Sequence, residues 1–345
     1  MGLLVEGKWH TDWYDTKENN GRFVRKAPSF RNWITKDGSA GPSGEAGFKA
    51  EAGRFHLYVS LACPWAHRAL IFRTLKGLEH MISISVVNTF MGDEGWTFSE
   101  GKDVIADFVN NKTHLHEIYS LAQSDYTGRV TVPVLWDKKL NTIVSNESPE
   151  IIRMLNSAFD DIGAKAGDYY PKILQDEIDE LNDFIYPAIN NGVYRAGFAT
   201  TQIAYQEAVT DVFNALNSLE KRLAGKRFLT GDTITEADWR LFTTLVRFDA
   251  VYVGHFKCNQ RRIVDYPNLW GYLRELYQVP GISDTVKLDH IKEHYYGSHE
   301  SINPTRIVPM GPLFELKSDF MGAHNREALF ANKYIAKNLK PEVNA

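Results

Sequence analysis

Cys63 stands at a point in the sequence where a thiol can be activated. Segment 55–60, Phe-His-Leu-Tyr-Val-Ser, has the composition of a β-strand, and Pro64 suits the first position of a helix. A sulfur between a strand and a helix start faces unpaired N–H groups and the positive end of the helix dipole, which lowers the pKa of a thiol. We therefore expect a nucleophilic thiolate at Cys63. The alternative is a buried cysteine that acts as a small apolar side chain.

The residues after Cys63 indicate how a disulfide on its sulfur is resolved. Cys63-Pro64-Trp65-Ala66 is similar to a thioredoxin-type Cys-x-x-Cys in which Ala66 replaces the second cysteine. A mixed disulfide on Cys63 must therefore be resolved by an outside thiol, and glutathione is the abundant intracellular candidate. Cys258, the other cysteine of the chain, lacks this setting, and we expect it to be inert.

Two further motifs are suited to hold a peptide-like thiol. Val132-Pro133 starts a predicted strand at the thioredoxin-fold position of a cis-proline, which exposes the backbone of Val132 to a peptide; the alternative is an ordinary edge-strand proline. Glu147-Ser148 opens the next predicted helix, where N–H groups and a hydroxyl hold a carboxylate and Glu147 pairs with an ammonium. A plain helix cap is the alternative there. Together the motifs predict a receptor for an amino-acid end group.

The elements that position these residues follow the order β-α-β, insertion, β-β-α. The predicted strands and helices are 55–60, 65–76, 82–87, 132–136, 141–144 and 148–155. The insertion, 88–129, is long for a connection, and we expect it to carry a function.

Helical periodicity dominates the chain after about residue 168. Apolar spacing predicts helices at 173–185, 204–223, 239–251 and 269–277, and Thr235-Glu236-Ala237-Asp238 predicts a capping box. We therefore expect a helical bundle. The first 50 residues lack periodicity but contain Trp9, Trp13 and Trp33, so we expect an extended arm that packs on the body.

Composition excludes several classes of protein. A length of 345 residues suits about two domains, and a net charge of -4 leaves no basic footprint for nucleic acid. The start of the chain is polar, which predicts neither a signal peptide nor a membrane anchor. Two cysteines suggest a reducing compartment, so we expect a cytoplasmic protein with no membrane partner.

Six segments spread along the chain carry a specific pattern. They are Cys63-Pro64-Trp65-Ala66-His67-Arg68, Gly95-Trp96-Thr97-Phe98, Gly128-Arg129-Val130-Thr131-Val132-Pro133, Ser145-Asn146-Glu147-Ser148, Asn190-Asn191-Gly192-Val193-Tyr194 and His294-Tyr295-Tyr296. In this order they resemble the glutathionyl-hydroquinone reductases, the xi class of the glutathione transferases. The resemblance runs from Trp9 to about Gly311.

The resemblance implies a glutathione transferase fold and a homodimer. This fold combines an α/β thioredoxin-like N-terminal domain (βαβ-ββα) with an all-α helical C-terminal domain. The implied division is 1–50 for the arm, 51–160 for the thioredoxin-like glutathione-binding domain, 168–311 for the helical substrate domain and 312–345 for the C-terminal tail.

The resemblance also implies the site. Cys63 is the expected nucleophile, glutathione is a co-substrate, and we expect neither a tightly bound cofactor nor a metal. The implied glutathione-binding residues are Trp96, Arg129, Val132, Glu147 and Ser148. The implied hydroquinone-binding residues are Tyr194, Tyr252 and Tyr295, with Tyr296 as an alternative to Tyr295. For His67 and Arg68 we favour structural roles over acid–base roles.

The expected reaction is the glutathione-dependent reduction of S-glutathionyl-hydroquinones to hydroquinones. It would pass through a mixed disulfide between Cys63 and glutathione, which a second glutathione resolves to oxidised glutathione. A conjugating transferase is one alternative, but it needs a hydroxyl that activates glutathione, whereas a cysteine there would be trapped as a mixed disulfide. A non-catalytic module with the same fold is the other alternative.

Overall fold

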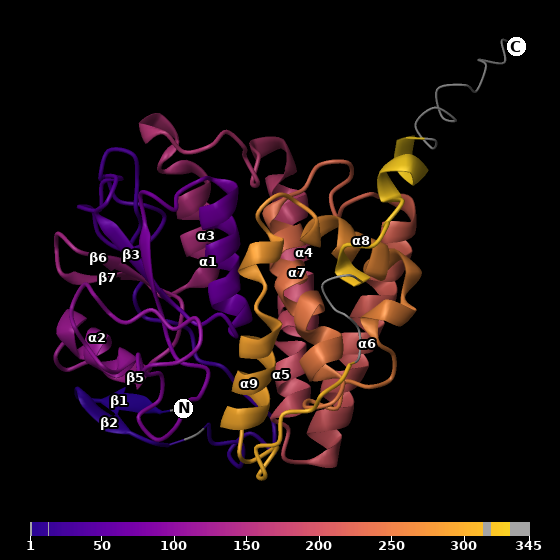
Figure 1. The fold of residues 1–345 in the computed structure, drawn as a ribbon, viewed down its shortest axis with the longest axis horizontal. Helices are drawn as coiled ribbons and strands as arrows, with labels where there is room; N and C mark the ends of the chain where they lie inside the picture. The colour runs from indigo at the N-terminus through magenta and orange to yellow at the C-terminus, as the bar shows by residue number, and fades with distance from the viewer. Residues whose placement is uncertain (1, 13, 313–318, 332–345) are drawn as a thin grey trace, which may run out of the picture.

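The computed structural model has two parts that lie side by side, one with β-sheets and helices and one that is helical (Figure 1). The structure describes residues 2–12, 14–312 and 319–331, so Trp13 and most of the predicted tail lie outside the described residues. The first half of the chain, indigo to magenta, holds both β-sheets, and the second half is helical. Within the described ranges, no helix is long and apolar enough to span a membrane.

A four-stranded mixed sheet forms the core of the first half. From residue 55 on, the helices and strands of this half are β3 (Phe55–Val59), α1 (Pro64–Leu75), β4 (Ser83–Val86), α2 (Leu115–Ala122), β5 (Gly128–Arg129), β6 (Val134–Asp137), β7 (Thr142–Ser145) and α3 (Ser148–Ser157). The strand order in the four-stranded sheet is β4-β3-β6-β7. β3 and β4 are parallel, as a helical crossover requires, whereas β6 and β7 are antiparallel. α1 and α3 lie between this sheet and the helical half (Figure 1).

The predicted order β-α-β, insertion, β-β-α is confirmed, and the insertion contains one helix that the sequence did not predict. α2 begins with a capping box between His114 and Glu117. Histidine is not among the preferred N-cap residues, so the start signal was absent from the pattern.

The extended arm expected at the start of the chain begins with a β-hairpin, which the sequence analysis did not predict. β1 (Leu3–Val5) pairs with β2 (Lys8–His10) and with β5 in a second, three-stranded sheet. Glu6 and Gly7 have φ of 47° and 74°, the left-handed values of a two-residue hairpin turn. The rest of the arm packs on the body through buried side chains that include Phe23, Ile34 and Phe48.

The second half of the chain is a bundle around one buried helix. Its helices are α4 (Gln175–Ile185), α5 (Gly192–Gly197), α6 (Gln202–Gly225), α7 (Glu236–Arg247), α8 (Pro267–Tyr277) and α9 (Leu288–Ser298). All 12 residues of α7 are buried. The predicted capping box of Thr235 and Asp238 is confirmed at the start of α7. The prediction missed α5 and α9.

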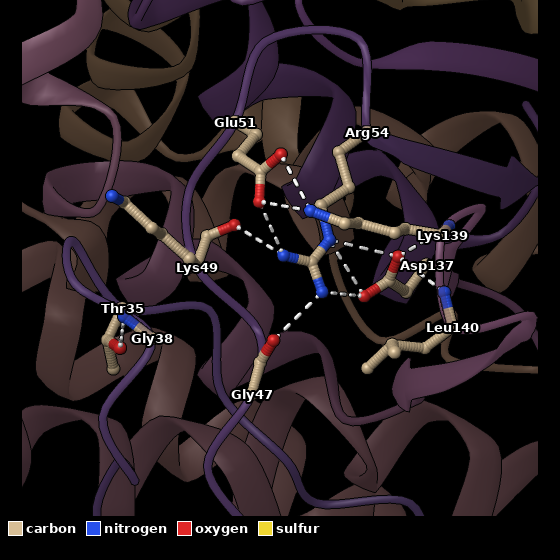
Figure 2. A network of polar contacts seen from close by, with 9 residues as sticks. All are labelled: Thr35, Gly38, Gly47, Lys49, Glu51, Arg54, Asp137, Lys139 and Leu140. Carbon is tan, nitrogen blue, oxygen red and sulfur yellow. Dashed lines mark hydrogen bonds and ion pairs between the residues drawn. The ribbon is translucent and has the colours of Figure 1, made fainter.

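Arg54 fixes the end of the arm to the sheet (Figure 2). Its guanidinium binds the carboxylate of Asp137 at 2.5 Å, and the two side chains are only 5% and 0% exposed. The same guanidinium donates to the carbonyl oxygens of Gly47 at 2.9 Å and Lys49 at 3.3 Å, and to Glu51 at 2.8 Å. Asp137 also accepts two N–H groups of the β6–β7 turn. One ion pair therefore joins the arm, β3 and the β6–β7 hairpin.

We predict that Asp137→Ala lowers the free energy of unfolding by about 3–5 kcal/mol, because it leaves the Arg54 charge buried and unpaired. Urea unfolding followed by circular dichroism measures the change. The matched control is Glu51→Ala, which removes the partner that is 39% exposed and should cost about 1 kcal/mol or less. Equal losses in the two variants would contradict this assignment.

Candidate active site

Cys63 caps the N-terminus of α1, as the sequence predicts. Its backbone is extended, with φ -77° and ψ 123°, and Pro64 occupies the first turn. The thiol donates to the carbonyl oxygen of Val132 at 3.5 Å. The sulfur is half-buried, so it is held beside the start of β6 and still faces a cavity.

The expected low pKa of Cys63 is wrong for the ligand-free protein. Burial is the largest influence and raises the pKa of the thiol, although the N–H groups of Ala66 and Trp65 and the charges of Arg247 and Arg25 act in the opposite direction. The sequence indicates the helix end but not the depth of the site. Burial also raises the pKa of Cys258 to about 12, in keeping with the inert thiol expected there.

A buried guanidinium from the helical half holds the loop before Cys63. Arg247, the last residue of α7, donates to the carbonyl oxygens of Ala62 at 2.9 Å and Leu61 at 3.2 Å. It also contacts Nδ1 of His67 at 3.0 Å. An arginine can only donate, so Nδ1 accepts and the proton of His67 is on Nε2, 2.8 Å from the hydroxyl of Thr285.

This geometry assigns His67 and Arg68 to structural contacts. Burial keeps the pKa of His67 well below its usual value, so the ring is neutral. Arg68 donates to Asn190 at 2.9 Å and to the hydroxyl of Ser148 at 3.4 Å. Its guanidinium also lies 4.6 Å from the ring centre of Trp65.

Two adjoining cavities meet beside Cys63. The larger has a volume of about 710 Å³, and four of the five predicted glutathione-binding residues line it: Arg129, Val132, Glu147 and Ser148. The smaller has a volume of about 60 Å³, and its walls include Cys63, Trp96, Tyr194 and Tyr295. Residues that line both cavities are Tyr14, Arg25, Trp65, Thr131 and Val132. The structure thus brings the predicted residues to one place, except Tyr252, which lines neither cavity.

The N-terminus of α3 forms one end of the larger cavity. Glu147 is the N-cap residue of α3 and Ser148 is its first residue. Burial raises the pKa of the Glu147 carboxyl, while the charges of Arg31 and Arg68 oppose the shift. The Val132–Pro133 peptide bond is cis, as predicted. A carboxylate acceptor and a free helix start at one end suit the two charged groups of an amino acid.

Trp96 and Arg129 are held in place by α9 and by the N-terminal arm. Trp96 stacks on His294 with ring centres 4.6 Å apart. The loop before it is closed by Trp9, whose indole donates to the Asp93 carbonyl at 2.9 Å. The guanidinium of Arg129 lies 4.3 Å from the ring centre of Tyr14 and donates to the Asp12 carbonyl.

The hydroxyls of three predicted tyrosines converge from three elements of the helical half. Tyr295 of α9 forms hydrogen bonds with Tyr194 of α5 and, at 3.1 Å, with Tyr252 of a π-helical turn. Tyr296 is outside this cluster, because its hydroxyl donates to the carbonyl of Ala250 at 3.5 Å. Burial raises the pKa of all three cluster tyrosines, that of Tyr252 to about 12. They are therefore neutral donors near neutral pH.

Several residues of the site were not identified from the sequence. Tyr14 and Arg25 come from the arm, which showed no periodicity, and His299 lines the smaller cavity just after α9. His294 stands in one of the six segments but had no role assigned to it. The role of Arg247 depends on its burial at the end of α7, which only the structure shows.

A separate cluster of Glu94, His114 and His116 has the composition of a metal site but not its geometry. The two imidazoles stack with ring centres 5.1 Å apart at 10°. A metal ion lies in the plane of each ring that binds it, so two stacked parallel rings do not direct their lone pairs at one ion. Nε2 of His116 instead lies 3.1 Å from the Glu94 carboxylate. We assign no metal to this cluster.

Comparison with known proteins agrees with this architecture. The family model of the glutathione S-transferase N-terminal domain matches residues 62–158, and that of the C-terminal domain matches residues 202–275. The chain is 58% identical over 331 residues to the glutathionyl-hydroquinone reductase YqjG of Escherichia coli strain K12, covering 96% of this chain and 100% of YqjG. It is 56% identical to the glutathionyl-hydroquinone reductase PcpF of Sphingobium chlorophenolicum, covering 90% and 96%.

Solved structures give the same result. The glutathione-bound structure of YqjG matches with a TM-score of 0.88 at 55% identity, covering 95% of this chain and 100% of that one. A xi class glutathione transferase from Natrialba magadii matches with a TM-score of 0.86 at 48% identity, covering 95% and 97%. The chain therefore belongs to the glutathionyl-hydroquinone reductases, within the xi class of the glutathione transferases.

Proposed function

We propose that the protein reduces S-glutathionyl-hydroquinones to hydroquinones, with glutathione as co-substrate and Cys63 as nucleophile. One observation carries the proposal: the sulfur of Cys63 faces a small cavity with a tyrosine wall, and that cavity adjoins, at Thr131 and Val132, a larger cavity suited to a peptide. A glutathionyl-hydroquinone has a peptide and a phenolic ring joined at one sulfur, so each part has a matching wall.

In this proposal the larger cavity holds the glutathione part of the substrate. Glu147 pairs with the ammonium of the γ-glutamyl group, and Ser148 with the α3 N-terminus binds its carboxylate. The backbone of Val132 pairs with the cysteinyl residue, Arg129 completes the wall, and Trp96 contacts the substrate from the adjoining smaller cavity. This arrangement places the substrate sulfur next to that of Cys63, since Cys63 contacts Val132 directly.

The chemistry balances in two steps. In the keto form of the ring, the carbon that carries sulfur has already gained a proton. The Cys63 thiolate attacks that sulfur, the carbon–sulfur bond breaks, and its electron pair passes to the ring, which leaves as a hydroquinonate and then takes a proton. The thiolate of a second glutathione attacks the mixed disulfide, and the products are oxidised glutathione and the Cys63 thiolate.

The tyrosine cluster suits the first step. Tyr194, Tyr252 and Tyr295 are neutral, and a neutral hydroxyl donates a hydrogen bond to a developing ring oxyanion. The smaller cavity has a volume of about 60 Å³, and Tyr194 and Tyr295 line it, so a ring that enters it meets their side chains. The hydroxyl bonds within the cluster would then be exchanged for bonds to the substrate.

A conjugating transferase fits the site less well. Such an enzyme needs a hydroxyl where the sulfur of glutathione is held, and the N-cap position of α1 carries the thiol of Cys63 instead. A turnover assay for oxidised glutathione separates the two activities, because conjugation produces none.

The proposed assembly is a homodimer in the cytoplasm. Membership of the xi class supports the dimer. The two free cysteines support a reducing compartment. Light scattering of the purified protein should give the mass of two chains, and the mass of a single chain at micromolar concentration would contradict the dimer.

We predict that Cys63→Ser abolishes turnover, because a serine hydroxyl is not ionised at neutral pH and forms no disulfide. Glutathione binding, measured by calorimetry, should persist. Cys258→Ser is the matched control, since that thiol is 0% exposed, and it should retain activity. If Cys63→Ser keeps more than a few per cent of the wild-type rate, which corresponds to a rise of only about 2 kcal/mol in the barrier, another group is the nucleophile.

We also predict that replacing Tyr194, Tyr252 and Tyr295 with Phe slows hydroquinone release. Each lost hydrogen bond to the oxyanion should raise the barrier by about 1.5–3 kcal/mol, or roughly ten- to a hundred-fold in rate. Reduction of a small glutathione mixed disulfide should hardly change, because its leaving thiolate needs no such donors.

The ratio of the two activities is the measurement, and Tyr296→Phe is the matched control because its hydroxyl lies outside the cluster. An equal fall in both activities would assign the tyrosines to the fold or to the glutathione site.

A further inference from the structure

Arg25 reaches from the N-terminal arm into the space beside Cys63. Its guanidinium lies 5.2 Å from the ring centre of Trp65 and 5.3 Å from that of Tyr194. Nε donates to the side-chain oxygen of Asn191 at 3.3 Å. Arg25 also lines both cavities, so it stands at the boundary between the peptide part and the ring part of the site.

Arg25 differs from the neighbouring arginines of the arm in having no carboxylate partner. Arg22 pairs with Glu207 at 2.8 Å, and Arg31 pairs with Glu150. Among the ion pairs of the described residues, none includes Arg25. A half-buried cation without a counter-ion is costly unless a ligand supplies the negative charge.

The groups that face Arg25 are weak acids that become negative on ionisation. They are the hydroxyls of Tyr14, Tyr186 and Tyr194 and the thiol of Cys63. Arg25 and Arg247 are the two cations that favour the Cys63 thiolate. Tyr194 and Tyr252 also face that thiol, and His294, Tyr295 and His299 line the same cavity.

The two cations are not equivalent. The guanidinium of Arg247 is engaged by the carbonyl oxygens of Leu61, Ala62 and Thr243 and by His67. It is therefore fixed in the protein and cannot turn to a ligand. Among the hydrogen bonds of the described residues, Arg25 forms one, which its Nε donates. Its two terminal nitrogens can therefore donate to a ligand at the junction of the cavities.

We propose that Arg25 is a catalytic residue, the counter-ion of the anions that form in the active site. The proposal rests on the proposed function and deepens it. Before the attack the negative charge is on the Cys63 thiolate. When the sulfur–sulfur bond forms and the carbon–sulfur bond breaks, the charge passes to the oxygen of the departing hydroquinonate. Arg25 lines the cavity that contains both positions and stabilises the charge at both.

The first test needs no substrate. The rate of Cys63 alkylation by iodoacetamide is measured against pH in the Cys258→Ser background. The midpoint of the parent should lie above the ~8.5 of a free thiol, because burial raises the pKa. Arg25→Gln should raise the midpoint by about one further pH unit, since an opposite charge at this range favours the thiolate. Arg25→Lys should restore most of the difference. An unchanged midpoint in Arg25→Gln would overturn the proposal.

The second test is kinetic. Arg25→Gln should lower kcat for a glutathionyl-hydroquinone roughly ten- to a hundred-fold with little change in KM, and Arg25→Lys should recover part of it. Arg22→Gln, on the same arm but paired at the surface, is the matched control and should retain full activity. If Arg25→Lys loses as much activity as Arg25→Gln, the side chain of Arg25 serves packing and its positive charge has no part in catalysis. That result would overturn the proposal.

Circular dichroism checks that each variant is folded. Arg25→Met keeps the side-chain stem against the Trp65 ring and serves as a second neutral variant, which must give the same shift in midpoint as Arg25→Gln. A parent enzyme without hydroquinone reductase activity would refute the proposed function. The alkylation midpoints would still decide whether Arg25 acts on the thiolate, so the two failures are distinguishable.

Discussion

The position of the thiol depends on one buried guanidinium, that of Arg247. This side chain ends α7, the helix buried along its whole length, and it binds the two carbonyl groups that precede Cys63. The tyrosine cluster belongs to the same helical half. The distance between Cys63 and the tyrosine cluster therefore depends on the helical half, which holds both. The arm and the sheet form the other side of the site. A small tilt of α7 would move the sulfur relative to Val132 and the α3 N-terminus.

The Cys63 sulfur is surrounded by neutral groups and two permanent cations, Arg25 and Arg247. Burial keeps His67 and His299 uncharged and lowers the pKa of His294 to about 4, so these three histidines of the site contribute no charge near neutral pH. The cluster tyrosines are likewise neutral. Positive charge beside the sulfur comes from arginines, whose protonation does not vary with physiological pH. Electrostatic support for an anion is thus constant across the pH range in which the enzyme works.

Local signals in the sequence identified the parts of the site that depend on local structure. Pro64 after Cys63, the Val132-Pro133 pair and Glu147-Ser148 each mark the end of one element, and the structure places them as predicted. Properties of the site that depend on tertiary packing could not be predicted from such local signals. Burial reversed the expected shift of the thiol pKa, and the choice between Tyr295 and Tyr296 required the orientation of α9 against α5. Arg25 reaches the site from a segment without periodicity.

The narrowness of the smaller cavity also protects the nucleophile. Peroxides react with thiolates, and each oxidation beyond the sulfenic acid is irreversible for an enzyme of this kind. A thiol that is half-buried and has a raised pKa presents little thiolate while the site is empty. An enzyme with such a thiol would thereby keep its sulfur reduced between turnovers.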